Sequence, residues 1–413
     1  MICTYYNFFM LNYLKLETKN SRLVIPQSLL RDLQSKITKL PAPAFLTHQV
    51  NLLILKKSLQ PYQKYQNVII IANGGSRTTA LGFYQALKNP ASKKNFEFLS
   101  TMDPAVIFAL KKKYSPQNTL VMPISKSGAN VDVLEPLLQF LNYPVLPVTS
   151  QHQGVLCEIA QKYHWPIINH PEVGGRFSGR TECGFAPAIL MNLPVAKINQ
   201  AAVDAYQTLS YQAPLKKNPA FLAAAISWLL EKKGYTEIFM PVYSASLAGF
   251  LPLLTQLIHE STGKNKKGQT FYGAEAPESQ HHTNQRFFGG KRNVFGWFIT
   301  VTDTKHNLIT KVPAKIKKLA LRHSTLVALH NIPLQTALQF DYQGVAENAN
   351  KLHIPNMTLT VSQVCPESVG ELLSFFHYYA VYSALLRQQN PFDQPEVEAA
   401  KAVSFKKRQV YSI

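Results

Sequence analysis

The residues of this chain that are best suited to proton transfer stand close together in the segment Gln256–His282. Glu260 ends an apolar helical pattern and supplies a carboxylate, which is a candidate base. A Gly- and Lys-rich loop and a short extended run follow, and His281, a candidate acid, stands where a second helix is predicted to begin. The helix dipole disfavours a carboxylate at a helix C-terminus, which indicates a functional reason for Glu260. The ordinary alternatives are a solvated surface glutamate and a polar helix histidine.

A candidate anion site lies between a predicted buried strand and a predicted helix, in the segment Ser125–Asn130 with sequence SKSGAN. Its glycine allows close backbone approach, and its donors are Ser125, Lys126, Ser127 and Asn130. This combination suits a dianionic phosphate at a helix N-terminus. The alternative is a polar turn that caps the helix. The turn Gly74–Ser76 follows another buried strand and aims its backbone N–H groups at an anion in the same way.

Two cationic side chains complete the set of candidates. Arg176 follows two glycines in GGRFS, so its guanidinium can approach a ligand without crowding from a neighbouring Cβ. A structural ion pair of Arg176 with Glu172 or Glu182 is the alternative. Lys401 ends the segment FDQPEVEAAK on a predicted helix, where a lone lysine is ordinarily solvated.

Alternating strands and helices are predicted to position these residues. Short β-branched runs such as Asn67–Ala72 and Thr119–Ile124 are typical of strands buried on both faces. Each is followed by a Gly-rich turn and a helical pattern, and a second alternating set begins after a polar segment around residues 200–217. The order indicates an α/β fold with parallel sheets and helices on both faces. Residues 1–60 are predicted to form helices that cover the first domain.

Composition limits the class of protein. The 413 residues are 46% apolar and 16% charged, which suits a globular chain of two domains, and the longest apolar runs are too short to cross a bilayer. The start of the chain lacks the features of a signal peptide and is assigned to the fold. The four cysteines, which form no C-x-x-C pair, favour a reducing compartment without a zinc site or disulfides: Cys3, Cys157, Cys183 and Cys365. The net charge of +20 is consistent with a solvated basic surface or an anionic partner, and no RNA-binding signature is present.

Taken together, the motifs resemble one family. GGS, SKSG, GGRFS, Q-x-x-x-E-S-x-G-K, Q-H and DQ-x-x-V-E-x-x-K occur in this order from about Val68 to Lys401, and the series is similar to that of glucose-6-phosphate isomerases. The resemblance implies two sugar-isomerase (SIS) domains, each a three-layer αβα sandwich with a parallel sheet, and a C-terminal helical tail. The implied divisions are residues 1–60, 61–205, 206–388 and 389–413. A cytoplasmic enzyme of glycolysis and gluconeogenesis is expected, with no cofactor and no metal.

The resemblance also implies a role for each motif. Glu260 moves the proton between C1 and C2 of the sugar, Arg176 stabilises the enediolate, and His281 and Lys401 open the ring. The substrate-binding residues are expected to be Gly75, Ser76, Ser125, Lys126, Ser127, Asn130, Gln256 and Gln394. In the family the histidine reaches the site of the other subunit, so a homodimer is expected. A phosphosugar is the expected partner, with no membrane and no nucleic acid.

The chain departs from the family pattern in four places, namely Ala72-Asn73, Ala129-Asn130, Arg180-Thr181-Glu182 and Glu396. None removes a catalytic group, but phosphate affinity and substrate choice depend on these surroundings. Two other functions therefore stay open. One is a different phosphosugar isomerase, including one that also accepts mannose 6-phosphate. The other is a non-catalytic SIS module that senses a sugar phosphate, which would have no need to keep Glu260, His281 and Lys401 together.

Overall fold

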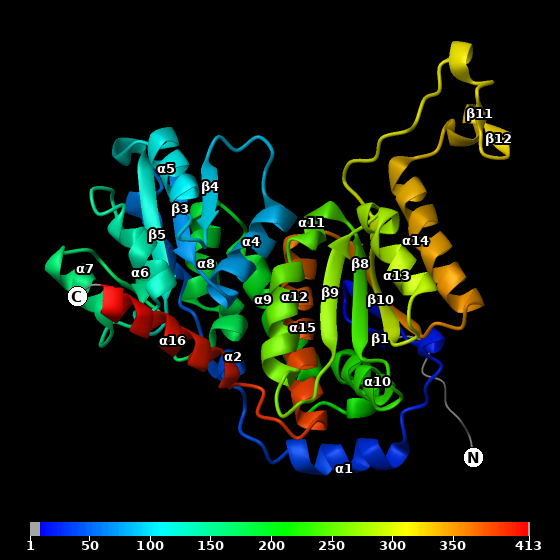
Figure 1. Cartoon of the computed structure of the whole chain (residues 1–413), viewed down its shortest axis with the longest axis horizontal. Helices are drawn as coiled ribbons and strands as arrows, with labels where there is room; N and C mark the ends of the chain where they lie inside the picture. The colour runs from blue at the N-terminus through cyan, green and yellow to red at the C-terminus, as the bar shows by residue number, and fades with distance from the viewer. Residues whose placement is uncertain (1–8, 412–413) are drawn as a thin grey trace.

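The chain folds into two α/β halves, each built around one sheet. The computed structural model describes residues 9–411, so Cys3 and the first eight residues of the predicted N-terminal segment lie outside the described part. In Figure 1 the two sheets stand side by side with helices around each. The predicted α/β class with helix-flanked sheets is thereby confirmed.

The first sheet has five strands in the order β4-β3-β5-β6-β7, and every neighbouring pair is parallel. Its strands are β3 (Asn67–Ala72), β4 (Asn95–Leu99), β5 (Thr119–Ser125), β6 (Val148–Thr149) and β7 (Ile168–Asn169). The helices between and after them are α4 (Gly75–Leu87), α5 (Pro104–Lys113), α6 (Val131–Leu138), α7 (Val155–Lys162) and α8 (Glu182–Leu190). β3 and β5 are almost wholly buried, because helices cover both faces of a central parallel strand.

The second sheet has six strands in the order β1-β2-β13-β10-β8-β9. Its parallel strands are β8 (Glu237–Tyr243), β9 (Thr270–Glu275), β10 (Val294–Asp303) and β13 (Asn356–Gln363). The helices of this half are α9 (Val195–Leu209), α10 (Pro219–Lys232), α11 (Ala245–Ala248), α12 (Leu251–Thr262), α13 (Thr283–Gly289), α14 (Leu334–Lys351) and α15 (Pro366–Leu386). The predicted boundary between residues 205 and 206 falls inside α9, and the division into domains stays a prediction.

The N-terminal segment differs from the helical cover that was predicted. Strands β1 (Phe9–Met10) and β2 (Leu14–Glu17) add an antiparallel edge to the second sheet, with Leu16 opposite Leu359 of β13. The prediction of helices packed on the first domain is wrong for these residues, which instead add an antiparallel edge to the parallel strands of the second sheet. The alternation of buried leucines with half-exposed charges in LKLE is the period-two pattern of an edge strand. Helices α1 (Gln27–Ile37), α2 (Ala44–Thr47) and α3 (Leu52–Leu59) follow, and α3 packs on α8 of the first half as expected.

Helix α15 lies at the centre of the molecule. It is buried along almost its whole length and packs against α9, α10 and α12, which explains why its sequence is apolar on every side. Its buried carboxylate, Glu371, accepts hydrogen bonds from the backbone N–H groups of Asn12 and Tyr13, at 3.1 and 2.8 Å. Burial raises the pKa of Glu371, and these hydrogen bonds oppose the shift. One apolar cluster contains side chains of both sheets, so the two halves share a core.

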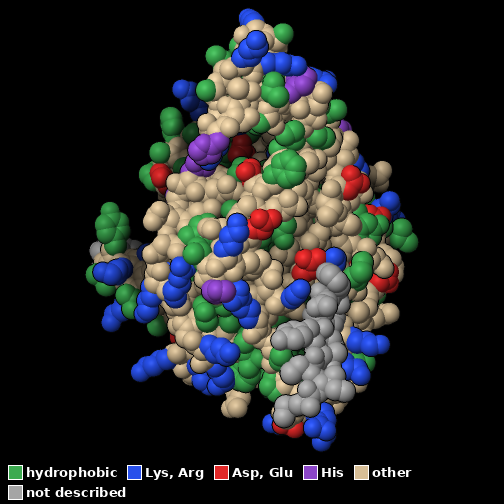
Figure 2. All heavy atoms as spheres, turned by 90° about the vertical axis from the view of Figure 1, so that its right-hand side faces the viewer, with side chains coloured by type: hydrophobic (Ala, Val, Ile, Leu, Met, Phe, Trp, Pro, Cys, Tyr) green, Lys and Arg blue, Asp and Glu red, His purple; other side chains and the backbone are tan. Residues whose placement is uncertain are grey.

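Residues 304–333 form an arm that projects away from the body (Figure 1). The arm contains the short strands β11 (Ala320–Leu321) and β12 (Ser324–Thr325), which pair only with each other. It carries no acidic residue and six cations: Lys305, Lys311, Lys315, Lys317, Lys318 and Arg322. Blue side chains at the top of Figure 2 mark this concentration of charge. Part of the net charge of +20 is therefore concentrated on this arm.

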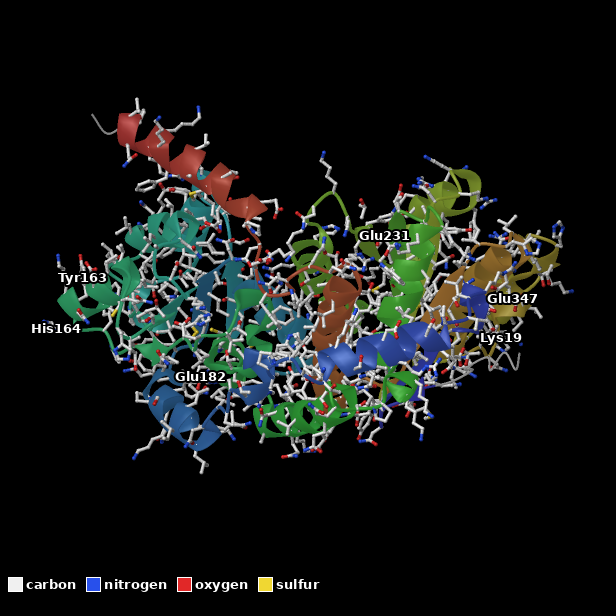
Figure 3. All side chains as sticks on the ribbon, turned by 90° about the horizontal axis from the view of Figure 1, so that it is seen from below. Lys19, Tyr163, His164, Glu182, Glu231 and Glu347 are labelled. Atoms are coloured by element: carbon white, nitrogen blue, oxygen red, sulfur yellow. The ribbon has the colours of Figure 1, made fainter. Side chains whose placement is uncertain are left out.

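The C-terminal helix α16 (Glu396–Tyr411) contains Lys401, so the helix predicted at this position is confirmed. Figure 3 shows that it runs along one side of the first half, which is the half that carries the label Tyr163. None of its described residues is buried. Arg408 attaches it to α6 through Glu135, with Nη2 2.9 Å from the carboxylate oxygen Oε2.

Candidate active site

Arg176 is the most heavily bonded side chain at the junction of the two halves. It lies in the 3-10 segment η4 (Gly175–Arg180), and its side chain is 2% exposed. All five N–H groups of its guanidinium donate hydrogen bonds. The acceptors are Glu260 Oε2 (2.9 Å), Gln394 Oε1 (2.8 Å), Ser261 Oγ (3.1 Å) and the main-chain oxygens of Pro391 (2.6 Å) and Asp393 (3.1 Å). Burial lowers the pKa of Arg176, and Glu260 opposes this shift.

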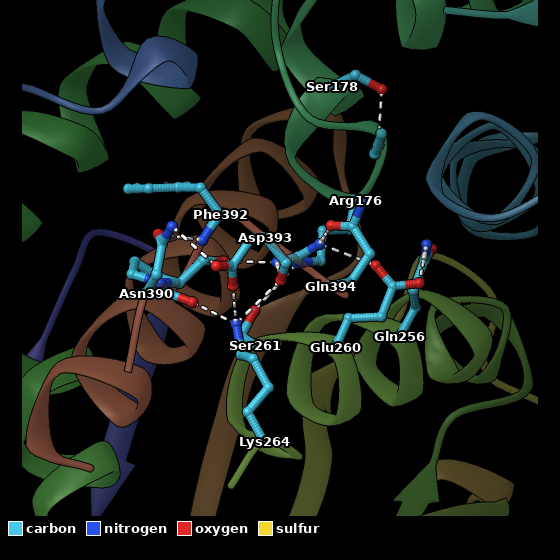
Figure 4. Close-up of polar contacts among 12 residues, drawn as sticks. Arg176, Ser178, Gln256, Glu260, Ser261, Lys264, Asn390, Phe392, Asp393 and Gln394 are labelled. Carbon is cyan, nitrogen blue, oxygen red and sulfur yellow. Dashed lines mark hydrogen bonds and ion pairs between the residues drawn. The ribbon is translucent and has the colours of Figure 1, made fainter. Parts of the chain in front are cut away.

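Glu260 lies on the last turn of α12, as predicted. The apolar face of this helix is buried, which turns Glu260 toward the first half, where Arg176 binds one carboxylate oxygen. Gln256, one turn earlier, donates to the other oxygen at 2.9 Å. Figure 4 shows the carboxylate between Arg176 and Gln256. With its side chain 24% exposed, Glu260 is neither a free surface residue nor sealed in the core.

The alternative ion pairs of Arg176 do not occur. Glu172 pairs with Lys126 at 2.8 Å, and Glu182 pairs with His48 at 2.8 Å. Arg180, one of the departures from the family pattern, donates hydrogen bonds to the main-chain oxygens of residues 45, 46 and 48. Arg180 and Glu182 therefore tie the N-terminal helices to η4, and neither contacts Glu260.

The Gly-rich turns pack directly against these catalytic candidates. Gly74 has φ +56°, and a Cβ there would lie 2.8 Å from the Gln256 amide nitrogen. A Cβ on Gly75 would lie 2.0 Å from the main-chain oxygen of Gly175, so only glycine fits at this contact. The N-terminus of α4, which begins at Gly75, is thereby held against the Arg176 loop and α12. Ser76 follows on the first turn of the helix and is buried.

The predicted phosphate loop follows β5 in the adjacent position of the same sheet. Ser125 ends the strand, is 3% exposed, and its hydroxyl has no hydrogen-bond partner among the described residues. Asn130 is the N-cap residue of α6, yet its side chain makes no capping bond. Ser127 is exposed, and its Oγ accepts only a 3.3 Å bond from Ala129 N. The polar side chains of this loop therefore make few hydrogen bonds within the described residues and are available to a ligand.

Two predicted site residues do not join this group. His281 lies at the end of the 3-10 segment η6 (Glu278–His281), not at the start of an α-helix as predicted, and it is exposed. Lys401 on α16 is 60% exposed and pairs with Glu398 at 2.9 Å. Among residues 9–411, no hydrogen bond or ion pair links either side chain to Glu260.

Sequence reasoning missed Lys264 and Asp393, which lie beside Arg176 (Figure 4). The side chain of Lys264 is 6% exposed, and its Nζ donates to Asp393 Oδ1 at 2.6 Å. The sequence carried only a weak signal for it, because Lys264 stands in a run with three more polar residues before Gly268. The one pointer in the sequence was its place at the end of the E-S-x-G-K motif, four residues after Glu260.

The described residues offer no metal site and no membrane span. No group of three or more His, Cys, Asp or Glu side chains within residues 9–411 could hold a metal ion. In the same range no helix is long and apolar enough to cross a bilayer. Cys157, Cys183 and Cys365 are buried and unpaired.

Comparisons with known proteins give a consistent result. No model of a protein family matches the chain. The chain is 27% identical over 369 residues to the glucose-6-phosphate isomerase of Acholeplasma laidlawii, covering 85% of each protein. It is 26% identical over 367 residues to that of Methanocaldococcus jannaschii, covering 86% of this chain and 88% of the relative.

Solved structures share the fold. A hypothetical protein from Thermus thermophilus superposes with a TM-score of 0.85 at 22% identity, covering 95% of this chain and 99% of that protein. A glucose-6-phosphate isomerase from Chlamydia trachomatis superposes with a TM-score of 0.80 at 19% identity, covering 98% of this chain and 90% of that protein. The two helix-flanked sheets thus define an α/β protein in the same fold class as these two structures. Within that class, the relatives that match this chain across most of its length are glucose-6-phosphate isomerases.

Proposed function

We propose that this protein interconverts glucose 6-phosphate and fructose 6-phosphate by proton transfer through a cis-enediolate. The observation that carries the proposal is the contact between the Arg176 guanidinium and the Glu260 carboxylate at 2.9 Å, beside the Gly-rich start of α4. An aldose–ketose isomerase needs a positioned carboxylate base, a cation for the oxyanion that develops, and a phosphate grip. The described residues provide candidates for all three without a metal ion or cofactor.

The base in this proposal is Glu260. It removes the proton from C2 of open-chain glucose 6-phosphate, and the electrons of the C–H bond form the enediolate while negative charge gathers on the oxygen of C1. A proton then moves from the hydroxyl of C2 to the oxygen of C1, and return of the first proton from Glu260 to C1 leaves a carbonyl at C2, which gives fructose 6-phosphate. The hydrogen bond from Gln256 fixes one carboxylate oxygen and so limits the directions in which the base can reach.

Arg176 stabilises the enediolate, and its bonding limits how it can do so. Because all five donors are occupied, a substrate oxygen must replace an existing acceptor or interact with the charge at longer range. The Nη1 atom bonds to both Glu260 and Gln394, and the neutral Gln394 amide is the weaker acceptor of the two. We assign to Gln394 the role of yielding this position to the substrate.

The phosphate is assigned to the loop after β5. The unpartnered hydroxyl of Ser125, the hydroxyl of Ser127 and the amide of Asn130 are available as donors, and Lys126 adds a charge that Glu172 now neutralises. Gly75 and Ser76 line the sugar end through the first turn of α4. Asn73 Nδ2 donates to the main-chain oxygen of Asp132 at 3.3 Å, which holds the two loops next to each other. This proximity supports their joint use by one ligand.

Ring opening is assigned to His281 and Lys401. Both side chains are exposed, which fits a role that depends on a second copy for His281 and on a shift of α16 for Lys401. We therefore propose a homodimer in which His281 of each copy enters the site of the other. A cytoplasmic location accords with three buried cysteines that form no disulfide.

An assay coupled to NADP-dependent oxidation of glucose 6-phosphate tests the activity. Fructose 6-phosphate is expected to be converted to glucose 6-phosphate in this assay. A second reaction that starts from mannose 6-phosphate shows whether the pocket accepts both aldoses. Binding of fructose 6-phosphate with no turnover and no solvent-deuterium exchange at carbon would instead identify a sugar-phosphate sensor and refute the proposed enzyme.

A further inference from the structure

The turn formed by residues 389–394 is held from both halves of the molecule. From the first half, Arg176 donates to the main-chain oxygens of Pro391 and Asp393, and the ring of Phe177 packs on that of Phe392 with 5.5 Å between centroids. From the second half, Lys264 donates to the main-chain oxygens of Asn390 and Asp393. The turn therefore bridges the two halves next to Glu260.

One atom joins the two cations. The main-chain oxygen of Asp393 accepts a hydrogen bond from Arg176 Nη2 at 3.1 Å and another from Lys264 Nζ at 2.9 Å. The Asp393 carboxylate also accepts from Lys264, at 2.6 Å, and from Asn390 Nδ2, at 3.1 Å. Figure 4 shows Lys264 reaching up to this turn while Arg176 reaches it from the other side. The position of the shared oxygen thus depends on both side chains.

The charges in this group balance. Arg176 and Lys264 are 2% and 6% exposed, and Glu260 and Asp393 supply one carboxylate for each. A cation this deeply buried is costly unless it is paired and fully hydrogen-bonded, so a lysine placed there for packing alone would be unfavourable. The hydrogen bonds with Lys264 hold the pKa of Asp393 below its ordinary value. The Asp393 carboxylate is therefore charged at neutral pH.

We propose that Lys264 is a positioning residue for Arg176, an inference that rests on the function proposed above. Lys264 fixes the turn that supplies three of the five acceptors of Arg176, namely the oxygens of Pro391, Asp393 and Gln394. With those acceptors fixed, the guanidinium keeps its place when Nη1 exchanges a partner for the substrate oxygen. Without Lys264 the turn is free to shift, and a displacement of about 1 Å at such a site can cost roughly 10²-fold in rate.

The test uses Lys264→Met, which keeps the length of the side chain and removes its charge and donors. Asp393 is 49% exposed and retains Asn390 as a partner, so the fold is expected to tolerate the change. We expect kcat to fall by roughly 10²-fold with KM changed less than about threefold, because the phosphate loop is untouched. Lys266→Met, at an exposed lysine of the same loop, is the matched control and should behave as wild type. Lys264→Gln, which keeps a neutral donor, takes its place if the methionine variant does not fold.

A double-mutant cycle separates positioning from general structural support. In an Arg176→Lys background the added Lys264→Met change should cost less than about threefold, since the residue it positions is already gone. A second readout is calorimetric binding of a five-carbon sugar-phosphate hydroxamate, which mimics the enediolate. Its affinity should fall with Lys264→Met while that of fructose 6-phosphate stays nearly constant.

The outcomes distinguish the two proposals. If the wild-type protein binds the hydroxamate but does not turn over fructose 6-phosphate, the proposed isomerase function is rejected. The role of Lys264 is then still tested by a double-mutant cycle in which hydroxamate affinity is measured. An active wild type with an equally active Lys264→Met variant overturns the positioning role. So does a loss that is undiminished in the Arg176→Lys background, because Lys264 then acts independently of Arg176.

Discussion

Replacing Glu260 by glutamine is the most direct perturbation of the site, and the structure indicates how much it should cost. Four of the five hydrogen bonds of Arg176 go to other residues, and an amide oxygen can still accept the fifth. Exchanging a charged acceptor for a neutral one then costs about 1–2 kcal/mol of unfolding free energy. Gln256 can turn its amide, since its Oε1 is buried and has no partner among the described residues. We therefore expect a folded variant.

Catalysis should respond far more strongly than stability. Loss of a general base lowers kcat by roughly 10²–10⁴-fold, so Glu260→Gln should be close to inactive in the coupled assay. Solvent-deuterium incorporation at C2 should disappear in parallel, while binding of fructose 6-phosphate remains. Glu158→Gln, at an exposed position on α7, is the control for the chemical change alone. A Glu260→Gln variant that keeps a tenth or more of wild-type kcat, or still exchanges deuterium, would refute the assignment of the base.

Three further predictions concern other groups. Ser125→Ala should leave the melting temperature unchanged or slightly raised, because the hydroxyl has no partner in the protein, and should raise KM roughly 10- to 100-fold if it binds phosphate. Lys401→Met should melt like wild type, since the side chain is exposed, yet turn over cyclic substrate at least about tenfold more slowly; unchanged turnover would remove Lys401 from ring opening. Burial and the nearby Arg180 lower the pKa of His377 to about 3. The unfolded chain therefore takes up a proton below pH 6.5 that the folded chain refuses, and unfolding free energy should fall by about 1.4 kcal/mol per pH unit from there toward pH 3. Denaturant titrations at pH 6 and 5 should show this slope reduced in His377→Asn, and an unaltered slope would contradict the assignment.

The convergence of distant motifs could be predicted from sequence because each follows an element with a clear pattern. Asn67–Ala72 and Thr119–Ser125 are continuous apolar runs, and the carboxyl ends of parallel strands share one edge of the sheet. The approach of Glu260 to Arg176 followed from the resemblance, since nothing in local periodicity connects residues so far apart. That contact is the part of the site on which the resemblance and the structure agree.

Other features depended on tertiary contacts that leave little trace in sequence. The alternation in residues 14–17 was present but too short to stand out against the helical patterns around it. Lys264 looked like a solvated cation because its acceptors come from residues 390–393. His281 and Lys401 lie on exposed segments, and within residues 9–411 neither side chain makes a hydrogen bond or ion pair with Glu260.

The pairing of β2 with β13 limits how this chain can be divided. Without residues 9–17, the row of backbone groups on the outer side of β13 would face water, which is a template for unwanted strand addition by other molecules. A truncated form that starts at residue 61 would thus keep both sets of predicted active-site loops and yet be prone to aggregate. Recombinant work on either half alone should retain this N-terminal ribbon or supply a substitute for it.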